Sequence, residues 1–242
     1  MISIEHLTKS YRKFKALDDI NLSFECGQAI SLLGPNGSGK TTLIKSILGL
    51  AIPESGTIRI NGIKISKDWE YRSQIGYMPQ IGRYPENMTI AQVIKMLKEI
   101  RKDSQKYDEE MIERFGLSQH WNKTMSSLSG GTRQKVSACL AFLFCPDIFI
   151  MDEPTAGLDP LSSEILKEKI AKECANGKLI LITSHVLSDL EDIASHVVYL
   201  QDGKLKLYNT VEELKYLTGE EKLNKVIASI MQNELPKKVA AI

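Results

Sequence analysis

Residues 34–42 have the types and spacing of a loop that binds phosphate groups. The loop follows the apolar run 29–33 and precedes residues 43–48, whose apolar positions have helical spacing. Glycines let the backbone turn its N–H groups toward an anion, and the start of a helix carries about half a positive charge. Because strand, loop and helix follow in order, a plain Gly-rich turn is the weaker interpretation. The loop consists of Gly34, Pro35, Asn36, Gly37, Ser38, Gly39, Lys40, Thr41 and Thr42.

Three side chains could complete a site for a nucleotide and its metal ion. Lys40 places a positive charge near the β and γ phosphates, and the hydroxyl of Thr41 is a ligand for Mg²⁺. Tyr11 lies in the polar segment 9–15, which we expect to be a loop between strands at 2–6 and 21–33. Its ring could stack on adenine, or it could be an ordinary surface side chain.

Two adjacent carboxylates, Asp152 and Glu153, end the continuous apolar run 148–151. Such a run is typical of a buried parallel strand. Neighbouring side chains diverge along a strand, so Asp152 could hold Mg²⁺ while Glu153 acts as a general base on an attacking water. Charged strand ends are common, and it is the phosphate loop that favours the catalytic interpretation.

Two further polar residues follow predicted strands. Gln80 ends the short strand 75–80, and His185 comes after the strand 178–183. Ligands gather at the carboxyl ends of parallel strands, so we expect both near the phosphate loop. Gln80 alone is a polar residue without an assigned role. His185 is the functional candidate among the histidines, and we expect His6, His120 and His196 to be structural.

A second glycine-containing turn lies at 128–132, before a helix predicted at 133–144. Ser129 supplies a hydroxyl, and Gly130 and Gly131 expose N–H groups at the positive end of that helix. The turn is either a second anion site or a simple helix cap, and these residues alone favour the cap.

Composition limits the classes of function. The 242-residue chain is 43% hydrophobic, enough for the core of one large or two small domains. Its net charge of +1 gives no general attraction to nucleic acid or to an anionic membrane. The four cysteines have no metal-ligand spacing, so we expect reduced thiols and neither disulfide nor zinc. The N-terminus lacks a signal peptide pattern, and the most apolar region, 138–151, is shorter than the ~20 residues that span a membrane.

The remaining patterns predict an α/β core with a helical insertion. Hairpins are predicted around Asn61-Gly62 and Asp202-Gly203, and capping boxes at Thr89 and Thr210. Helices are expected from Thr89, at 107–115 and at 161–174. We expect a core of 1–80 and 136–217, a helical subdomain at 81–135 and a C-terminal helical extension at 218–242. The extension has an apolar face that could pack on its own core, which we favour, or on a second subunit.

Taken in chain order, the motifs closely resemble those of the ATPase subunit of ATP-binding cassette (ABC) transporters. The motifs are the phosphate loop, Gln80, the turn 128–132, residues 150–159 and His185. The resemblance covers residues 1 to about 217. It implies a P-loop NTPase fold of the ABC ATPase type, with a mainly parallel sheet flanked by helices, an antiparallel β subdomain and an inserted helical subdomain. It also implies hydrolysis of ATP with Mg²⁺, a head-to-tail dimer of ATPase domains and a separate transmembrane subunit.

The same resemblance implies roles for individual residues. Tyr11 would stack on adenine, Lys40 would bind phosphates, and Thr41, Gln80 and Asp152 would organise Mg²⁺. Glu153 would be the general base, and His185 would touch the γ phosphate. Ser129, Gly130 and Gly131 would contact the ATP of the opposing subunit, and Asp159 would cross the dimer seam. Thr132 departs from the family, which usually has glutamine there, so contacts made by that glutamine are in doubt.

A narrower resemblance concerns residues 77–89 and the segment from Tyr199 onward, which look like the NosF-type ATPase. That subfamily works with a membrane subunit and a periplasmic partner in maturing the copper site of nitrous oxide reductase. Another ABC exporter of drugs, lipids or peptides is the alternative. A soluble ABC ATPase acting on DNA or ribosomes is disfavoured by the single cassette and the lack of basic excess. We therefore expect a cytoplasmic protein held peripherally at the inner membrane by its membrane subunit, without nucleic acid.

Overall fold

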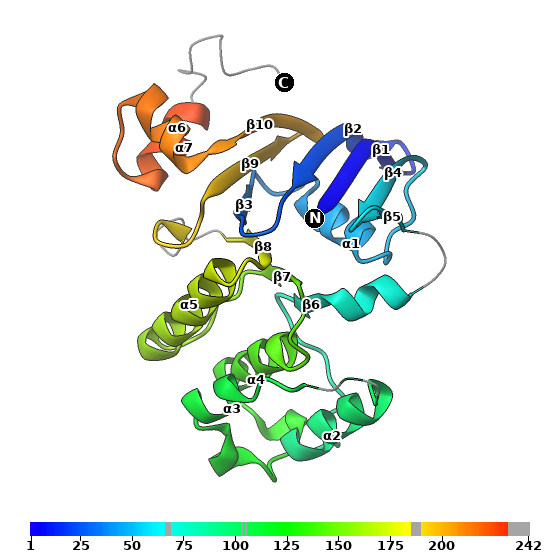
Figure 1. The fold of residues 1–242 in the computed structure, drawn as a ribbon, viewed down its shortest axis with the longest axis vertical. Helices are drawn as coiled ribbons and strands as arrows, with labels where there is room; N and C mark the ends of the chain where they lie inside the picture. The colour runs from blue at the N-terminus through cyan, green and yellow to red at the C-terminus, as the bar shows by residue number, and fades with distance from the viewer. Residues whose placement is uncertain (66–68, 103, 105, 185–189, 232–242) are drawn as a thin grey trace.

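The computed structural model describes residues 1–65, 69–102, 104, 106–184 and 190–231. Two β-sheets and a lobe of helices make up the molecule (Figure 1). The first sheet is antiparallel, in the order β2-β1-β4-β5. Its strands are β1 (Ile2–Tyr11), β2 (Phe14–Phe24), β4 (Ser55–Ile60) and β5 (Ile63–Lys64).

The second sheet is mainly parallel, in the order β10-β9-β3-β8-β7-β6, and only β10 runs antiparallel to its neighbour. Its strands are β3 (Ala29–Leu33), β6 (Ile75–Met78), β7 (Ile148–Asp152), β8 (Leu179–Thr183), β9 (His196–Gln201) and β10 (Lys204–Thr210). A mainly parallel sheet with a separate antiparallel sheet confirms the predicted fold class.

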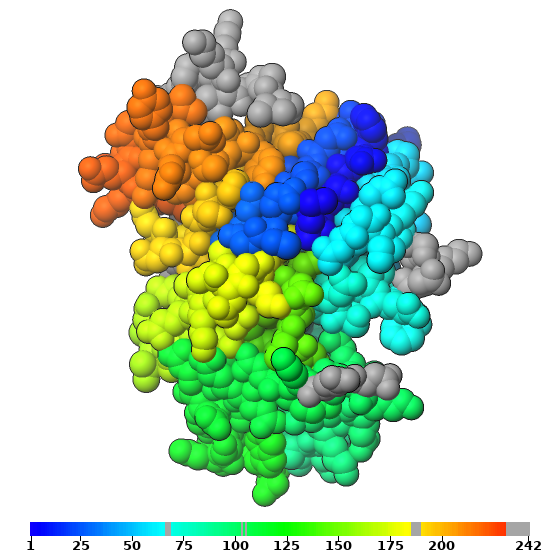
Figure 2. Space-filling view, viewed as in Figure 1, coloured from blue at the N-terminus to red at the C-terminus, as the bar shows by residue number. Residues whose placement is uncertain are grey.

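The helices complete the chain as follows: α1 (Lys40–Ile47), α2 (Ile90–Ile100), α3 (Glu110–Arg114), α4 (Gly130–Phe142), α5 (Pro160–Ala175), α6 (Val211–Thr218) and α7 (Leu223–Met231). Short 3-10 helices occur at η1 (Glu70–Gln74), η2 (Leu117–His120) and η3 (Met125–Ser127). We call α2, α3 and α4 with their connections the helical lobe; it forms the lower end of the molecule in Figures 1 and 2. Within the described ranges, no helix is long and apolar enough to cross a membrane.

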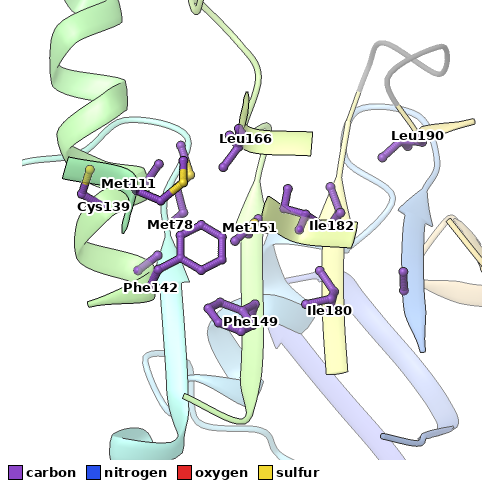
Figure 3. Close-up of a cluster of buried hydrophobic side chains, with 14 of the residues drawn as sticks. Met78, Met111, Cys139, Phe142, Phe149, Met151, Leu166, Ile180, Ile182 and Leu190 are labelled. Atoms are coloured by element: carbon purple, nitrogen blue, oxygen red, sulfur yellow. The ribbon is translucent and has the colours of Figure 1, made fainter. Parts of the chain in front are cut away.

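Successive side chains of the parallel strands point to opposite faces of the second sheet, and both faces are buried. On β7, Ile148 and Ile150 join a cluster with α1 and the antiparallel sheet. Phe149 and Met151 point the other way, into a cluster with α4 and α5 (Figure 3). Apolar clusters on both faces of the sheet therefore fix the positions of the carboxyl ends of β7 and β8.

Ion pairs join α5 to the helical lobe at Lys169, which is only 1% exposed. Its ammonium donates to Asp108 at 2.6 Å, to Glu110 at 2.9 Å and to Glu173 at 2.8 Å. Burial lowers the pKa of Lys169, but hydrogen bonds to these three carboxylates outweigh that effect and raise it. The cluster fixes one cation between two parts of the fold.

Several local predictions are confirmed. Asn61 and Gly62 form the turn between β4 and β5 with φ of 49° and 79°, and the capping box at Thr89 begins α2. The capping box at Thr210 begins α6. Helix α7 buries its apolar face on the chain's own core, as favoured; the buried residues are Leu223, Val226, Ile227 and Ile230.

Three predictions are wrong in detail. Tyr11 and Phe14 pair across a hairpin between β1 and β2, so segment 9–15 is mostly strand rather than loop. The helix predicted at 107–115 is limited to 110–114. At its start the carboxylate of Asp108 accepts the backbone N–H of Glu110, and beyond its end Gly116 has a φ of 63°. Helix α4 begins at Gly130, so the two glycines form its first turn and do not precede it.

Candidate active site

The phosphate-loop residues wrap the start of α1 in a conformation that requires glycine. Gly39 caps the helix with φ of 109°, and a Cβ at this position would lie 2.4 Å from the carbonyl oxygen of Ala16. A Cβ at Gly34 would lie 2.1 Å from the carbonyl oxygen of Leu200. The loop is also tied to the turn between β9 and β10, since the N–H of Gly203 donates to the Ser38 carbonyl at 3.2 Å.

Lys40 bends back over this loop. Its ammonium donates to the carbonyl of Gly34 at 2.7 Å and to that of Pro35 at 3.1 Å. Burial lowers the pKa of Lys40, and the charges of Asp152 and Glu153 oppose that effect. The cation and the two carboxylates therefore share one electrostatic environment.

Ser38 tests whether the loop fits a phosphate. Ser38 is only 2% exposed. In the part of the chain that the structure describes, its hydroxyl has no hydrogen-bond partner. A buried hydroxyl without a partner costs free energy of roughly 1–3 kcal/mol. A bound phosphate oxygen would supply the missing acceptor, so the residues present fit an anion.

The two carboxylates lie where β7 ends beside β8. Asp152 pairs in register with Thr183, whose hydroxyl donates to the Asp152 carboxylate. Glu153 follows with φ of 51°, a left-handed conformation that is uncommon for a residue with a side chain. Its N–H donates to the Thr183 carbonyl at 3.0 Å. Asp152 is thus the last residue of β7, and Glu153 begins the turn that follows the strand.

One cavity of about 380 Å³ gathers most of the predicted site. Ligand pockets in proteins begin at roughly 300 Å³. The cavity is lined by Tyr11, Phe14, Ala16, Asn36, Gly37, Ser38, Gly39, Lys40, Thr41, Thr42, Gln80, Asp152, Glu153, Thr183 and Ser184. Gln80 reaches it although β6 ends two residues earlier, at Met78. His185 lies outside the described residues.

Sequence reasoning missed four lining residues: Phe14, Ala16, Thr183 and Ser184. Thr183 and Ser184 could have been found, because they stand at the end of a predicted strand beside the carboxylates. Phe14 could not, because its place beside Tyr11 depends on the unpredicted hairpin. Tyr11 and Phe14 are 48% and 55% exposed, so two aromatic faces are open to a flat ligand.

Among the described residues, the predicted signature turn does not line this cavity. Ser129 instead caps α4, where its hydroxyl accepts the N–H of Thr132 at 3.2 Å. The hydroxyls of Ser129 and Thr132 lie 2.9 Å apart. The turn is thus a helix cap within its own chain, with its glycines at the start of α4.

Asp159 also lies outside the cavity, at the N-terminus of α5. Its carboxylate accepts the N–H of Ser162 at 2.9 Å and the ammonium of Lys135 at 2.9 Å. The hydrogen bond from Lys135 is the largest of the influences that hold the pKa of Asp159 well below its usual range. Asp159 therefore links α5 to α4 as a carboxylate.

Comparison with known proteins agrees with this arrangement. A model of the ABC transporter family matches residues 17–156. The uncharacterized ABC transporter ATP-binding protein YhaQ of Bacillus subtilis is 33% identical over 224 residues, covering 91% of this chain and 74% of that protein. The lipopolysaccharide export system ATP-binding protein LptB of Haemophilus influenzae is 32% identical over 222 residues, covering 88% and 92%.

Solved structures show the same fold. The structure of an ATP-binding subunit of an ABC transporter superposes with a TM-score of 0.85 at 28% identity, covering 96% of this chain and 99% of that one. A dimeric ATP-binding cassette in a post-hydrolysis state, bound to ADP and phosphate, gives a TM-score of 0.77 at 25% identity, covering 87% and 99%. The chain belongs to the ABC transporter family. It is an ATP-binding subunit that hydrolyses ATP.

Proposed function

We propose that two copies of this chain close head to tail and hold ATP between the phosphate loop of one copy and the signature turn of the other. The observation that carries the proposal is the division of the site. The cavity holds Lys40 and the carboxylates, whereas Ser129 lies outside it. The similar cassette that is a dimer bound to ADP and phosphate supports a dimer for this chain.

Within this dimer, each residue of the cavity has a proposed role. Tyr11 stacks on adenine, and the loop 34–42 and Lys40 bind the phosphates. The hydroxyl of Thr41, the amide oxygen of Gln80 and the carboxylate of Asp152 are the hard oxygen donors that Mg²⁺ prefers. The ion, when bound, neutralises charge on the β and γ phosphates. His185 contacts the γ phosphate, and Asp159 contacts the partner across the seam.

Glu153 is the proposed general base for the attacking water. Phosphoryl transfer asks a protein mainly for positioning and charge stabilisation. Both Asp152 and Glu153 line the cavity, so one acid is available for the metal and the other for the water. Closure of the dimer then adds Ser129, Gly130 and Gly131 as donors to the phosphates.

The proposed partner is a separate transmembrane subunit, which closure of the ATPase dimer would drive. A groove of about 380 Å³ runs between the core and the helical lobe, next to Gln80. Leu50, Tyr84, Leu97 and Phe144 give it apolar walls, and Arg83 and Arg101 add charge. A cytoplasmic segment of the membrane subunit docking here would hold the chain at the inner face of the membrane and move the helical lobe.

The resemblance of residues 77–89 to NosF-type ATPases supports a narrower assignment, in maturation of the copper site of nitrous oxide reductase together with a periplasmic protein. The alternative is an exporter of a drug, lipid or peptide. Co-purification with the membrane subunit, followed by its identification, separates the two. A partner unrelated to nitrous oxide reductase maturation would overturn the narrower assignment and leave the ATPase proposal intact.

Replacement of Glu153 by glutamine tests the central role. Glu153→Gln should keep ATP binding, slow turnover by at least the ~10²–10⁴-fold typical of a lost general base, and accumulate closed dimers. Steady-state phosphate release and size-exclusion chromatography with ATP measure the two effects. Glu99→Gln, the same change at an exposed position of α2, should alter neither. Unchanged turnover in Glu153→Gln would remove Glu153 from its role.

A further inference from the structure

Helix α4 carries a buried amide, Gln134, that the family motifs do not include. Gln134 is 6% exposed and lies about one turn after Ser129. Its amide nitrogen lies 3.3 Å from the carbonyl oxygen of Glu153 and 3.4 Å from that of Pro154. Both distances are long for N–H···O bonds, but both acceptors belong to the turn that carries the proposed base.

The backbone at Glu153 needs such support. Its φ of 51° is costly for a residue with a side chain, and a position of this kind persists only where its surroundings hold it. Thr183 holds the N–H side of the residue, with its carbonyl at 3.0 Å and its hydroxyl at 3.2 Å. Gln134 holds the carbonyl side. The N–H of Ala156, at 3.1 Å, shares the Glu153 carbonyl with it. From outside the turn, the left-handed conformation at Glu153 is therefore held by two anchors, one on β8 and one on α4.

Two more contacts bring the start of α4 against the same turn. A Cβ at Gly131 would lie 2.8 Å from the carbonyl oxygen of Gly157, so the helix and the turn approach at backbone distance. Lys135, next to Gln134, pairs with Asp159 at 2.9 Å. Residues 131–135 thus approach the segment 153–159 at three points. Two of these are polar contacts, one from Gln134 and one from Lys135, and the contact from Gln134 is the buried one.

We propose that Gln134 is a positioning residue for Glu153, which it holds in its left-handed turn from the helix that the signature turn begins. The proposal rests on the proposed role of Glu153 as general base. In this arrangement, the turn that contacts ATP in one site of the dimer is linked within a few residues to the base of the other site.

Gln134→Leu removes the amide and keeps a similar volume in an apolar setting. The Glu153 and Pro154 carbonyls lose a donor, so the turn should open more often and the base should spend less time in its active direction. We expect kcat to fall by about 10-fold, the cost of about 1.4 kcal/mol, with KM and the Kd for ATP within twofold of wild type. Gln134→Glu keeps the length of the side chain but has no donor when it is ionised. It should show the same pattern, a lower kcat with KM and the Kd for ATP unchanged.

Hydrogen exchange measures the turn without turnover. In the nucleotide-free protein, a peptide covering 152–158 should exchange faster in Gln134→Leu than in wild type. The N–H of Ala156 donates to the Glu153 carbonyl within that turn, and the N–H of Glu153 donates to the Thr183 carbonyl on β8, so both bonds should break more often. Cys139→Ala is the matched control: Cys139 is a 2% exposed residue of α4 in the apolar cluster of Figure 3. It should leave the exchange of this peptide and kcat unchanged.

A double-mutant cycle with Glu153→Gln separates positioning from general destabilisation. If Gln134 acts through Glu153, single-turnover rates of the double variant should equal those of Glu153→Gln. Additive losses, a parallel rise in KM, or unchanged exchange at 152–158 would overturn the proposal. Normal turnover in Gln134→Leu with slow turnover in Glu153→Gln would contradict the Gln134 proposal alone. Normal turnover in Glu153→Gln would contradict the assignment of Glu153 as the general base.

Discussion

The turns that begin α1 and α4 both carry glycines, but their backbones and surroundings differ. Gly39 caps α1 in the left-handed conformation with φ of 109°, whereas Ser129 caps α4 in the extended conformation. Both place glycines at the start of a helix, and both expose N–H groups at its positive end. The turn before α1 lies on the parallel sheet, where Lys40, Asp152 and Gln80 share its cavity. The turn before α4 lies on the helical lobe, away from that cavity. A helix start with glycines thus becomes a site only where the fold supplies the matching charges, within the chain or from a second copy.

The first test of this comparison destabilises the contact between α5 and the helical lobe. If the two regions are independent, the cavity should still bind ATP. Lys169→Met leaves three carboxylates around a missing cation. Removing one partner of a buried ion pair costs about 3–5 kcal/mol of unfolding free energy. Urea unfolding measures the loss, and the Kd for ATP should stay within twofold under conditions where the variant is folded.

Lys172→Met is the control, because Lys172 is exposed and pairs with Glu110 at the edge of the cluster. Its cost should remain below about 1 kcal/mol. A weakened ATP affinity in folded Lys169→Met would show that the two regions are not separable.

The second test changes the cavity and leaves the helical lobe intact. Lys40→Ala removes a charge-assisted hydrogen bond to phosphate, worth about 1.5–3 kcal/mol, so the Kd for ATP should rise by about 10–100-fold. Calorimetric titration of ATP measures it. Lys45→Ala, at an exposed position of α1, should bind as wild type. Unfolding of the helical lobe should not change in either variant, and unaltered affinity in Lys40→Ala would exclude Lys40 from phosphate binding.

A smaller effect should depend on pH. Hydrogen bonds from Lys172 and then Lys169 lower the pKa of Glu110 to about 2. Because this folded-state pKa is below the unfolded value, the ionised carboxylate stabilises the fold above pH ~4.5, and the contribution disappears as pH falls toward 2. Glu110→Gln should therefore cost about 1 kcal/mol at pH 7 and almost nothing near pH 2.

Thermal unfolding of wild type and Glu110→Gln across pH 2–7 measures the difference. Glu113→Gln, on the exposed side of the same helix, serves as the control and should show no comparable convergence at low pH. A difference between wild type and Glu110→Gln that grows in acid would contradict the ion-pair account.

Local rules predicted much of the fold, and distant contacts account for the errors. The Asn61-Gly62 turn and the capping boxes depend on residues a few positions apart, so the sequence alone indicates them. The extra strand at 9–11 depends on pairing with β2, and the short α3 depends partly on the N–H of Asp108 donating to Leu143 across the fold at 2.9 Å. Neither contact has a local pattern.

The site shows the same division. The phosphate loop and the strand ends were predicted because their types and order point to one edge of a parallel sheet. The sequence does not indicate Gln134, because a glutamine in a helix carries no motif and its acceptors lie about 20 residues further along the chain. The link from Lys135 to Asp159 likewise appears only when α4 and α5 are folded.

Mixing two inactive variants tests most directly whether each reaction centre needs two chains. Lys40→Ala lacks the phosphate-loop cation, and Ser129→Leu lacks the signature hydroxyl. In a mixed dimer, one centre has both defects and the other has neither. The ATP concentration is set to saturate wild type but not Lys40→Ala, so that neither variant alone releases phosphate. Random mixing makes half of the dimers mixed, so we predict that phosphate release returns to about a quarter of the wild-type rate. No recovery in dimers shown to exchange subunits, or full activity of Ser129→Leu as a monomer, would contradict the shared site.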